Sequence, residues 1–179
     1  SLAILLQEHL DTLPVHYLVQ VFATDIDSQA IATAGAGIYP ASVAADVSPE
    51  RLARYFSTDA DAGVVRIHKK IRDILVFSEQ DLIKDPPFSR LDLISCRNLL
   101  IYLDGELQKR LIPLFHYALS PGGFLVLGTS ETIGDFGDLF TVVDRKRKIY
   151  QRRDDAYGLR RPPLGRFLLP TPAKDAGPP

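Results

Sequence analysis

The alternation of apolar and polar positions predicts a strand between two helices near the start of the chain. The leucines of residues 2–10 are spaced as one face of a helix, which Pro14 ends. The apolar, β-branched run LVQVFATDID then predicts a strand that finishes in Asp25 and Asp27. The following segment, DSQAIATAGAG, predicts a helix capped by Asp27 or Ser28 and ended by its last glycines. The order is therefore strand, acidic turn, helix.

The next part of the chain interrupts this order. Ser48-Pro49-Glu50 is a favourable first turn for a short helix. VVRIHKK and IRDILVFS both alternate apolar and polar residues, and they predict two short strands paired antiparallel. We expect this pair to form a small β-subdomain at about residues 57–78. The prolines and acids of SEQDLIKDPPFSR then predict a loop.

Strands and helices alternate again from LDLISC onwards. This strand precedes an amphipathic helix in DGELQKRLIPLFHYAL, although Pro113 lies inside the helical pattern. SPGG predicts a turn, FLVLG an apolar strand, and LFTVVD with KRKIYQ a closing antiparallel pair. This order is typical of an α/β fold, in which helices cover both faces of a mostly parallel sheet.

Composition narrows the class of protein but names no function. The 179 residues suffice for one domain with a sizeable core, and 46% apolar with 24% charged residues is the balance of a soluble globular protein. A net charge of −1 gives no indication of nucleic acid or of a membrane surface as partner. The single cysteine, Cys96, excludes an intramolecular disulfide and fits a reducing, cytoplasmic location. No apolar run is long enough to insert into a membrane. Prolines, glycines and charges in residues 153–179 predict a linker or disordered tail.

Polar residues follow four of the predicted strands. In parallel sheets, ligands bind outside the carboxyl ends of the strands, so these residues are candidates for a site. They are Asp25 and Asp27, Asp81, Arg97 and Asn98, and Thr129, Ser130 and Glu131.

Two of these positions have an ordinary explanation beside a functional one. Asp25 could accept hydrogen bonds from ribose hydroxyls, or one of the two acids there could simply cap the next helix. Asp81 could meet the exocyclic amine of a base, with Leu82 against the ring, or it could be a surface acid of a loop.

The stretch LDLISCRNLLIYL poses a sharper question, because its pattern predicts that Arg97 and Asn98 lie in the core. Their fixed donors could hold a carboxylate, or Arg97 could form an internal ion pair. Tyr102 could turn its hydroxyl toward the same pocket or lie in the core. Cys96 is expected to be a small buried hydrophobe. The histidines lack metal-binding spacing, and no nucleophile–base motif occurs.

The segments ATDID, GIYP, SPERLARYF, FSEQDL, ISCRNLLIYL and PGGFLVLGTSE occur in the order found in the CheR-type chemotaxis receptor methyltransferases. The chain resembles this family over about residues 1–152. The resemblance implies a class I, Rossmann-like methyltransferase sheet with a small antiparallel β-subdomain insert. It also implies S-adenosyl-L-methionine (SAM) as cofactor, with S-adenosylhomocysteine as product.

The resemblance further implies the reaction and the roles of individual residues. The family methylates glutamate side chains on the cytoplasmic helices of chemoreceptors, which gives γ-glutamyl methyl esters. By matching positions, Asp25 is the ribose-binding acid, and Asp81 and Leu82 contact the adenine side. Arg97 and Asn98 line the cofactor and substrate pocket, and Tyr102 borders the transferred methyl group. Arg97 and Tyr102 are thus the expected catalytic residues.

The chain also departs from the family pattern. The family's first strand, its glycine-rich turn and its helical N-terminal domain have no counterpart here, so we expect weak binding or activity from this chain alone. The proline-rich tail resembles the linkers of hybrid sensor proteins, whose other domains would be partners. An alternative interpretation is that the chain is a catalytically inactive, methyltransferase-like interaction module of such a sensor. A third interpretation is a nucleotide-dependent oxidoreductase. The chain contains neither the GxGxxG segment nor the Tyr-x-x-x-Lys pair that such an enzyme would need.

Overall fold

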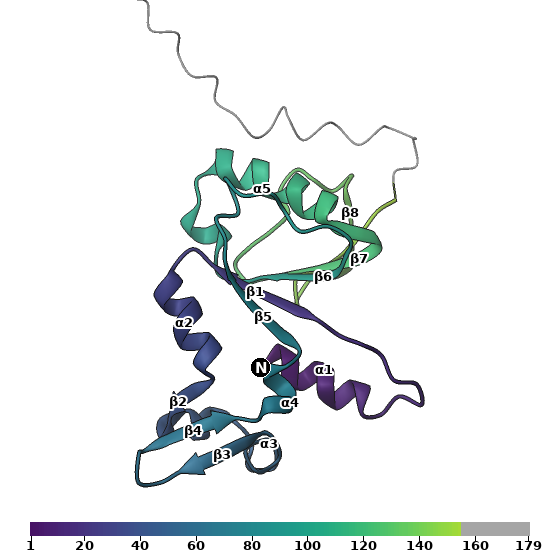
Figure 1. Ribbon diagram of the computed structural model, residues 1–179. Helices are drawn as coiled ribbons and strands as arrows, with labels where there is room; N and C mark the ends of the chain where they lie inside the picture. Colours follow the sequence, from purple (N-terminus) through teal and green to yellow (C-terminus); the bar gives the residue numbers. More distant parts are fainter. Residues whose placement is uncertain (155–179) are drawn as a thin grey trace, which may run out of the picture. The chain divides into compact units, whose positions relative to one another are not determined.

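A computed structural model describes residues 1–154 of the chain, which divide into two compact units with the boundary after Asp81 (Figure 1). The first unit contains a parallel pair of strands, a small antiparallel sheet and several helices. Its elements are α1 (Leu2–Leu10), β1 (Val21–Asp25), α2 (Ser28–Ala36), β2 (Ile38–Pro40), the 3₁₀-helix η1 (Ala41–Asp46), α3 (Pro49–Tyr55), β3 (Phe56–Asp59), β4 (Val64–Ile67), α4 (Lys69–Arg72) and β5 (Leu75–Glu79).

The strands of the first unit pair differently from the expectation. β5 lies parallel to β1, with Asp25 opposite Glu79 at the last position of the register. β4 pairs antiparallel with both β3 and β2, so the small sheet has the order β2-β4-β3. The expected hairpin between VVRIHKK and IRDILVFS is therefore wrong. The helical turn α4 follows β4 directly and separates it from β5, which leaves β5 to pair with β1.

Helix α2 shows how the sequence sets the bounds of an element. The Asp27 side chain caps its start by accepting a hydrogen bond of 2.8 Å from the backbone N–H of Gln29. Gly37 ends it in the left-handed conformation, with φ of 63°. A Cβ at Gly37 would lie 2.8 Å from Cγ2 of Ile67, so both the backbone and the space require glycine. The cap and the terminating glycine were predicted and are confirmed.

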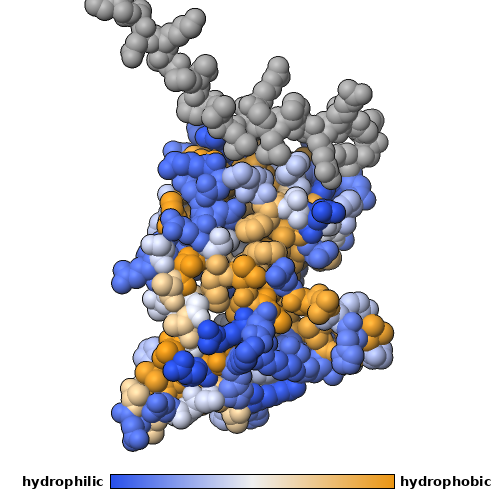
Figure 2. Space-filling view, viewed as in Figure 1, coloured by the Kyte–Doolittle hydropathy of each residue, from blue (hydrophilic) through white to orange (hydrophobic). Residues whose placement is uncertain are grey.

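Helix α1 buries a different face from the one expected. Ala3, Ile4 and Gln7 are its buried residues, whereas Leu2 and Leu5 are 37% and 48% exposed. Ala3 and Ile4 belong to a hydrophobic cluster of the first unit that also includes residues of α3, β4 and α4, namely Tyr55, Ile67 and Ile71. Hydrophobic residues also reach the surface in the loop between α1 and β1, where Val15 and Leu18 are exposed (Figure 2).

Ion pairs join α1 to its neighbours in the first unit. Glu8 accepts two hydrogen bonds from Arg51 of α3, at 2.8 Å from Nε and 2.7 Å from an Nη atom. Asp11, directly after α1, pairs with Arg54 of α3 at 2.7 Å and with Lys70 of α4 at 3.3 Å. The bidentate Glu8–Arg51 pair has the geometry in which a carboxylate and a guanidinium bind best.

The second unit, from Leu82 onwards, is built on a four-stranded sheet of order β6-β7-β9-β8. Its elements in the described residues are β6 (Leu91–Cys96), the 3₁₀-helix η2 (Leu100–Tyr102), α5 (Gly105–Ala118), β7 (Leu119–Leu127), β8 (Phe140–Asp144) and β9 (Ile149–Arg152). β6 and β7 are parallel and joined through α5, and β9 and β8 extend the sheet antiparallel. This crossover and the closing antiparallel pair were both predicted.

The core of the second unit lies between this sheet and α5. It contains side chains from β6, β7 and α5, among them Leu111, Phe115, Leu125 and Leu127, each no more than 6% exposed. α5 continues through Pro113 and starts at a cap in which Asp104 accepts a hydrogen bond of 2.8 Å from the N–H of Leu107. None of the helices in residues 1–154 is long and apolar enough to cross a bilayer. Most of the predicted tail, residues 155–179, lies outside the described residues.

Candidate functional site

Asp25 is the last residue of β1, and its carboxylate lies exposed at the carboxyl end of that strand. Its Oδ1 accepts a hydrogen bond of 3.0 Å from the backbone N–H of Asp27. Within residues 1–154, its other oxygen has no hydrogen-bond partner. Because Asp27 rather than Asp25 caps α2, the capping role does not account for Asp25. A carboxylate with a free oxygen at this position can accept hydrogen bonds from hydroxyl groups of a ligand.

Asp81 and Leu82 fall at the boundary of the two units, so each belongs to a different one. Asp81 closely follows β5 and is half-buried, which differs from a fully solvated loop acid. Leu82 is half-buried and packs against the hydrophobic core of the second unit.

Arg97 and Asn98 are exposed, and the expectation that they lie in the core is wrong. The strand β6 ends at the buried Cys96, so the next two residues already belong to the turn beyond it. Within residues 1–154, the Arg97 guanidinium forms neither a hydrogen bond nor an ion pair. The internal ion pair that the sequence left open is therefore absent from this part of the chain. An exposed guanidinium at a strand end remains available to bind a carboxylate bidentately.

Asn98 adopts a backbone conformation that few side chains tolerate. Its φ is 61°, in the left-handed region where asparagine is one of the most favourable residues after glycine. Its side-chain amide has no hydrogen-bond partner among the described residues, although its backbone N–H does. The amide thus keeps both donors and its acceptor for a ligand.

Tyr102 ends η2 and is 80% exposed, which excludes the alternative position in the core. Its hydroxyl has no hydrogen-bond partner in the described part of the chain. Arg97, Asn98 and Tyr102 are thus accessible side chains of the segment between β6 and α5.

Glu131 is the residue that the sequence reasoning missed. From the sequence it is one of three polar residues after a strand, with Thr129 and Ser130, and the pattern predicts no role for it. It is only 3% exposed and accepts backbone hydrogen bonds from Gly128 at 2.5 Å, Leu100 at 2.7 Å and Asn98 at 3.0 Å. The available signal was a glycine that ends an apolar strand and is followed three residues later by an acid, the spacing of a carboxylate that folds back onto a turn.

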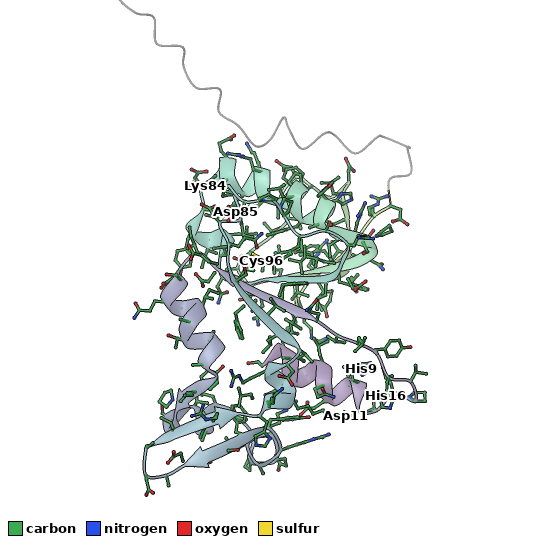
Figure 3. All side chains as sticks on the ribbon, in the orientation of Figure 1. His9, Asp11, His16, Lys84, Asp85 and Cys96 are labelled. Atoms are coloured by element: carbon green, nitrogen blue, oxygen red, sulfur yellow. The ribbon has the colours of Figure 1, made fainter. Side chains whose placement is uncertain are left out.

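Cys96 is the last residue of β6, and its side chain lies inside the second unit (Figure 3). Burial raises the pKa of its thiol to about 12, and the nearby negative charge of Glu131 adds to this effect. A neutral thiol at physiological pH is a poor nucleophile, so Cys96 behaves as the small hydrophobe that was predicted. Residues 1–154 contain no group of three or more His, Cys, Asp or Glu side chains that could hold a metal ion.

Parallel strand pairs with helices in their connections, and polar side chains at the carboxyl ends of the strands, are typical of a Rossmann-like, cofactor-binding α/β fold. Comparison with known families makes this class specific. Residues 1–149 match the family described as CheR methyltransferase, SAM binding domain, and the chain belongs to this family. The predicted fold class is confirmed, and the cofactor of the domain is S-adenosyl-L-methionine.

Several curated proteins resemble the chain. An uncharacterised 104.1 kDa protein of Rhodobacter capsulatus is 39% identical over 155 residues, which cover 86% of this chain and 16% of that protein. The chemotaxis protein methyltransferase of Salmonella typhimurium is 33% identical over 162 residues, or 87% of this chain and 54% of the relative. Chemotaxis protein methyltransferase 1 of Pseudomonas aeruginosa is 33% identical over 127 residues, or 70% and 46%. The chain thus spans about half the length of the two named methyltransferases.

Proposed function

We propose that this chain is the SAM-binding catalytic domain of a protein-glutamate O-methyltransferase. Its substrates are glutamate side chains on the cytoplasmic helices of chemoreceptors, which become γ-glutamyl methyl esters. Membership of the CheR family and the names of the relatives support this assignment. The observation that carries it is Arg97, an exposed guanidinium at the carboxyl end of β6 with no partner among the described residues. Such a group fits a substrate that presents a carboxylate.

The residues at the strand ends fit the proposed cofactor one by one. The free oxygen of Asp25 suits the ribose hydroxyls, and the unpartnered amide of Asn98 can both donate and accept. Asp81 and Leu82 supply an acid and an apolar surface for the adenine side. The exposed guanidinium of Arg97 can bind a carboxylate, either that of the substrate glutamate or that of the cofactor. These assignments follow the family pattern residue by residue.

For this reaction, the main task of these residues is to position the substrate carboxylate and the methyl group. When it is bound, SAM supplies a methyl group attached to a positively charged sulfur. A nucleophile can attack this methyl group directly. A glutamate side chain, with a pKa near 4.3, is already ionised at pH 7 and needs no general base. The proposed role of Arg97 is to hold that carboxylate by two parallel hydrogen bonds, so that one oxygen faces the methyl group. The proposed role of Tyr102 is to border the methyl group and limit the approach of water. A site built on an arginine, an amide and a phenol is sufficient for this task.

Transfer of labelled methyl groups tests the proposal. The chain is incubated with methyl-labelled SAM and a chemoreceptor cytoplasmic fragment, and base-labile methyl esters are measured as released methanol. We expect Arg97→Ala to lower kcat/KM roughly 100-fold, and Arg97→Lys to restore only part of it because lysine lacks the bidentate fork. Arg145→Ala, which alters an exposed arginine in the β8–β9 turn, is the matched control and should leave the rate unchanged. Equal rates for Arg97→Ala and Arg145→Ala would contradict the proposal.

A second candidate function is an inactive, methyltransferase-like interaction module within a multidomain sensor. The Rhodobacter capsulatus relative supports the multidomain part of this candidate, because the matching segment is only 16% of that longer protein. The partners would then be the other domains of the same sensor. Binding of S-adenosylhomocysteine without any methyl ester on a receptor fragment would support this candidate over the first.

A further inference from the structure

Glu131 places a carboxylate inside the second unit, and no cation of residues 1–154 pairs with it. A buried ionised group is stable only where hydrogen bonds replace its water shell. In this protein the replacement comes from the backbone, through the amides of Gly128, Asn98 and Leu100. Three charge-assisted bonds to one side chain form a fixed arrangement rather than an incidental contact.

The three donors belong to two different segments of the chain. Asn98 and Leu100 follow β6, whereas Gly128 follows β7, its parallel neighbour. The two strands end side by side, with Cys96 opposite Leu127 at the last position of their register. Glu131 therefore ties the two strand ends together at the edge of the sheet where ligands of such folds bind.

The turn above Glu131 is held tightly around it. A Cβ at Gly128 would lie 2.6 Å from Oε2 of Glu131, 2.7 Å from Oδ1 of Asn98 and 3.0 Å from the Asn98 backbone nitrogen. Only glycine fits at that position without moving the other two residues. The left-handed backbone of Asn98 directs its N–H to the buried carboxylate, while its side-chain amide remains without a protein partner. The conformation of the exposed Arg97–Asn98 turn thus depends on the carboxylate below it.

We propose that Glu131 is a positioning residue for the Arg97–Asn98 turn: its carboxylate fixes the backbone that presents Arg97 and Asn98 to the cofactor and to the substrate carboxylate. This inference rests on the proposed function, because it assigns those two side chains to ligand binding. Glu131 itself touches no ligand and acts only through the turn.

Three variants distinguish a role of Glu131 in positioning the Arg97–Asn98 turn from a purely structural role in the fold. Glu131→Gln keeps the size of the side chain but has one acceptor oxygen for three N–H donors, and its own amide group opposes one of them. Glu131→Asp keeps the charge and both oxygens on a shorter stem, so partial rescue is expected. Glu106→Gln is the matched control, since Glu106 is a first-turn residue of α5 whose side chain is 83% exposed.

Amide hydrogen exchange and calorimetric titration with S-adenosylhomocysteine are measured on each protein. For Glu131→Gln we expect at least tenfold faster exchange at Asn98, Leu100 and Gly128, unchanged exchange at Leu125 in the sheet, and at least tenfold weaker binding. Glu131→Asp should fall between this variant and the wild type, and Glu106→Gln should match the wild type. Faster exchange at the three amides with binding unchanged within twofold overturns the inference and leaves the proposed function standing.

A measurement on the wild-type chain covers the case in which Glu131→Gln does not fold. Addition of S-adenosylhomocysteine should shift the amide resonances of Asn98, Leu100 and Gly128 together, because one carboxylate connects them. Binding without any shift at these three amides overturns the inference. Absence of binding to the wild-type chain overturns the proposed function, and the inference with it.

Discussion

The backbone N–H of Gly128 donates a hydrogen bond of 2.5 Å to Oε2 of Glu131, and the backbone N–H of Glu131 in turn bonds to the carbonyl of Gly128 at 3.0 Å. This reciprocal pair closes the chain on itself directly after β7. It also brings the carboxylate of Glu131 to the turn that follows β6. The end of an apolar strand and the start of the candidate site are therefore one hydrogen-bonded structure.

Replacing Gly128 with alanine should destabilise this structure. The new Cβ would lie 2.6 Å from Oε2 of Glu131, an atom that accepts backbone hydrogen bonds from both Gly128 and Asn98. Overpacking of this kind costs about 1–3 kcal/mol. Thermal or denaturant unfolding measures the loss. Gly137→Ala is the control, because no atom lies within 4 Å of a Cβ there. Equal stability of the two variants would show that the turn adapts freely.

Asn98→Gly should separate the backbone of the turn from its side chain. Glycine adopts a φ of 61° without strain, so the free energy of unfolding should change by less than about 1 kcal/mol. Loss of the amide should nevertheless weaken S-adenosylhomocysteine binding about tenfold. Asn98→Ala should weaken binding and also lower stability by about 1 kcal/mol or more, because alanine resists the left-handed conformation. Calorimetric titration and denaturant unfolding of both variants provide the two numbers. Unchanged binding by Asn98→Gly would remove Asn98 from the site.

The sequence predicts most of the elements, because each of them has a local signal. Asp27 marks the start of α2 and Gly37 marks its end. The order of β6, α5 and β7 follows from the periodicity of apolar residues alone. Strand pairing has no comparable signal, so nothing local indicated that β5 pairs with β1.

The burial of site residues was likewise not predictable from local pattern. Arg97 and Asn98 stand in an apolar run, and only the end of β6 at Cys96 places them outside the core. The role of Glu131 depends on contacts across about 30 residues of chain, which periodicity does not reveal.

The Glu8–Arg51 pair should make the stability of the first unit depend on acidic pH. The hydrogen bonds and charge of Arg51 hold the pKa of Glu8 below its ordinary value of 4.5. The unfolded chain therefore binds a proton more readily, and the stability from this pair is complete above pH 4.5 and declines as the pH falls through the folded pKa. The free energy of unfolding of the wild type and of Glu8→Gln is compared between about pH 3 and about pH 7.

The difference in stability between wild type and Glu8→Gln should be largest near neutral pH and shrink in acid. Asp61→Asn serves as the control, because Asp61 is an exposed turn residue of the same unit without a partner in the described residues. A difference that stays constant with pH would show that the ion pair does not contribute.

Cys96 should resist modification while the protein is folded. Burial, with a contribution from the charge of Glu131, raises the pKa of its thiol to about 12 from an ordinary value of 9.0. Labelling by a thiol reagent should therefore remain slow when the pH is raised from 7 to about 9.5, and become fast and complete in denaturant. The folded state should also lose stability above pH 9, where the unfolded thiol ionises first. Rapid labelling of the native protein near pH 9 would contradict the burial of this side chain.

The central claim is the proposal that Asp25 binds the cofactor of a methyltransferase. Calorimetric titration with S-adenosylhomocysteine, up to millimolar concentration, tests it on the wild type, on Asp25→Asn and on Asp61→Asn as control. The account predicts weak but saturable binding to the wild type and to Asp61→Asn, and at least tenfold weaker binding to Asp25→Asn. Equal binding by all three proteins, or no binding by any of them, would contradict it.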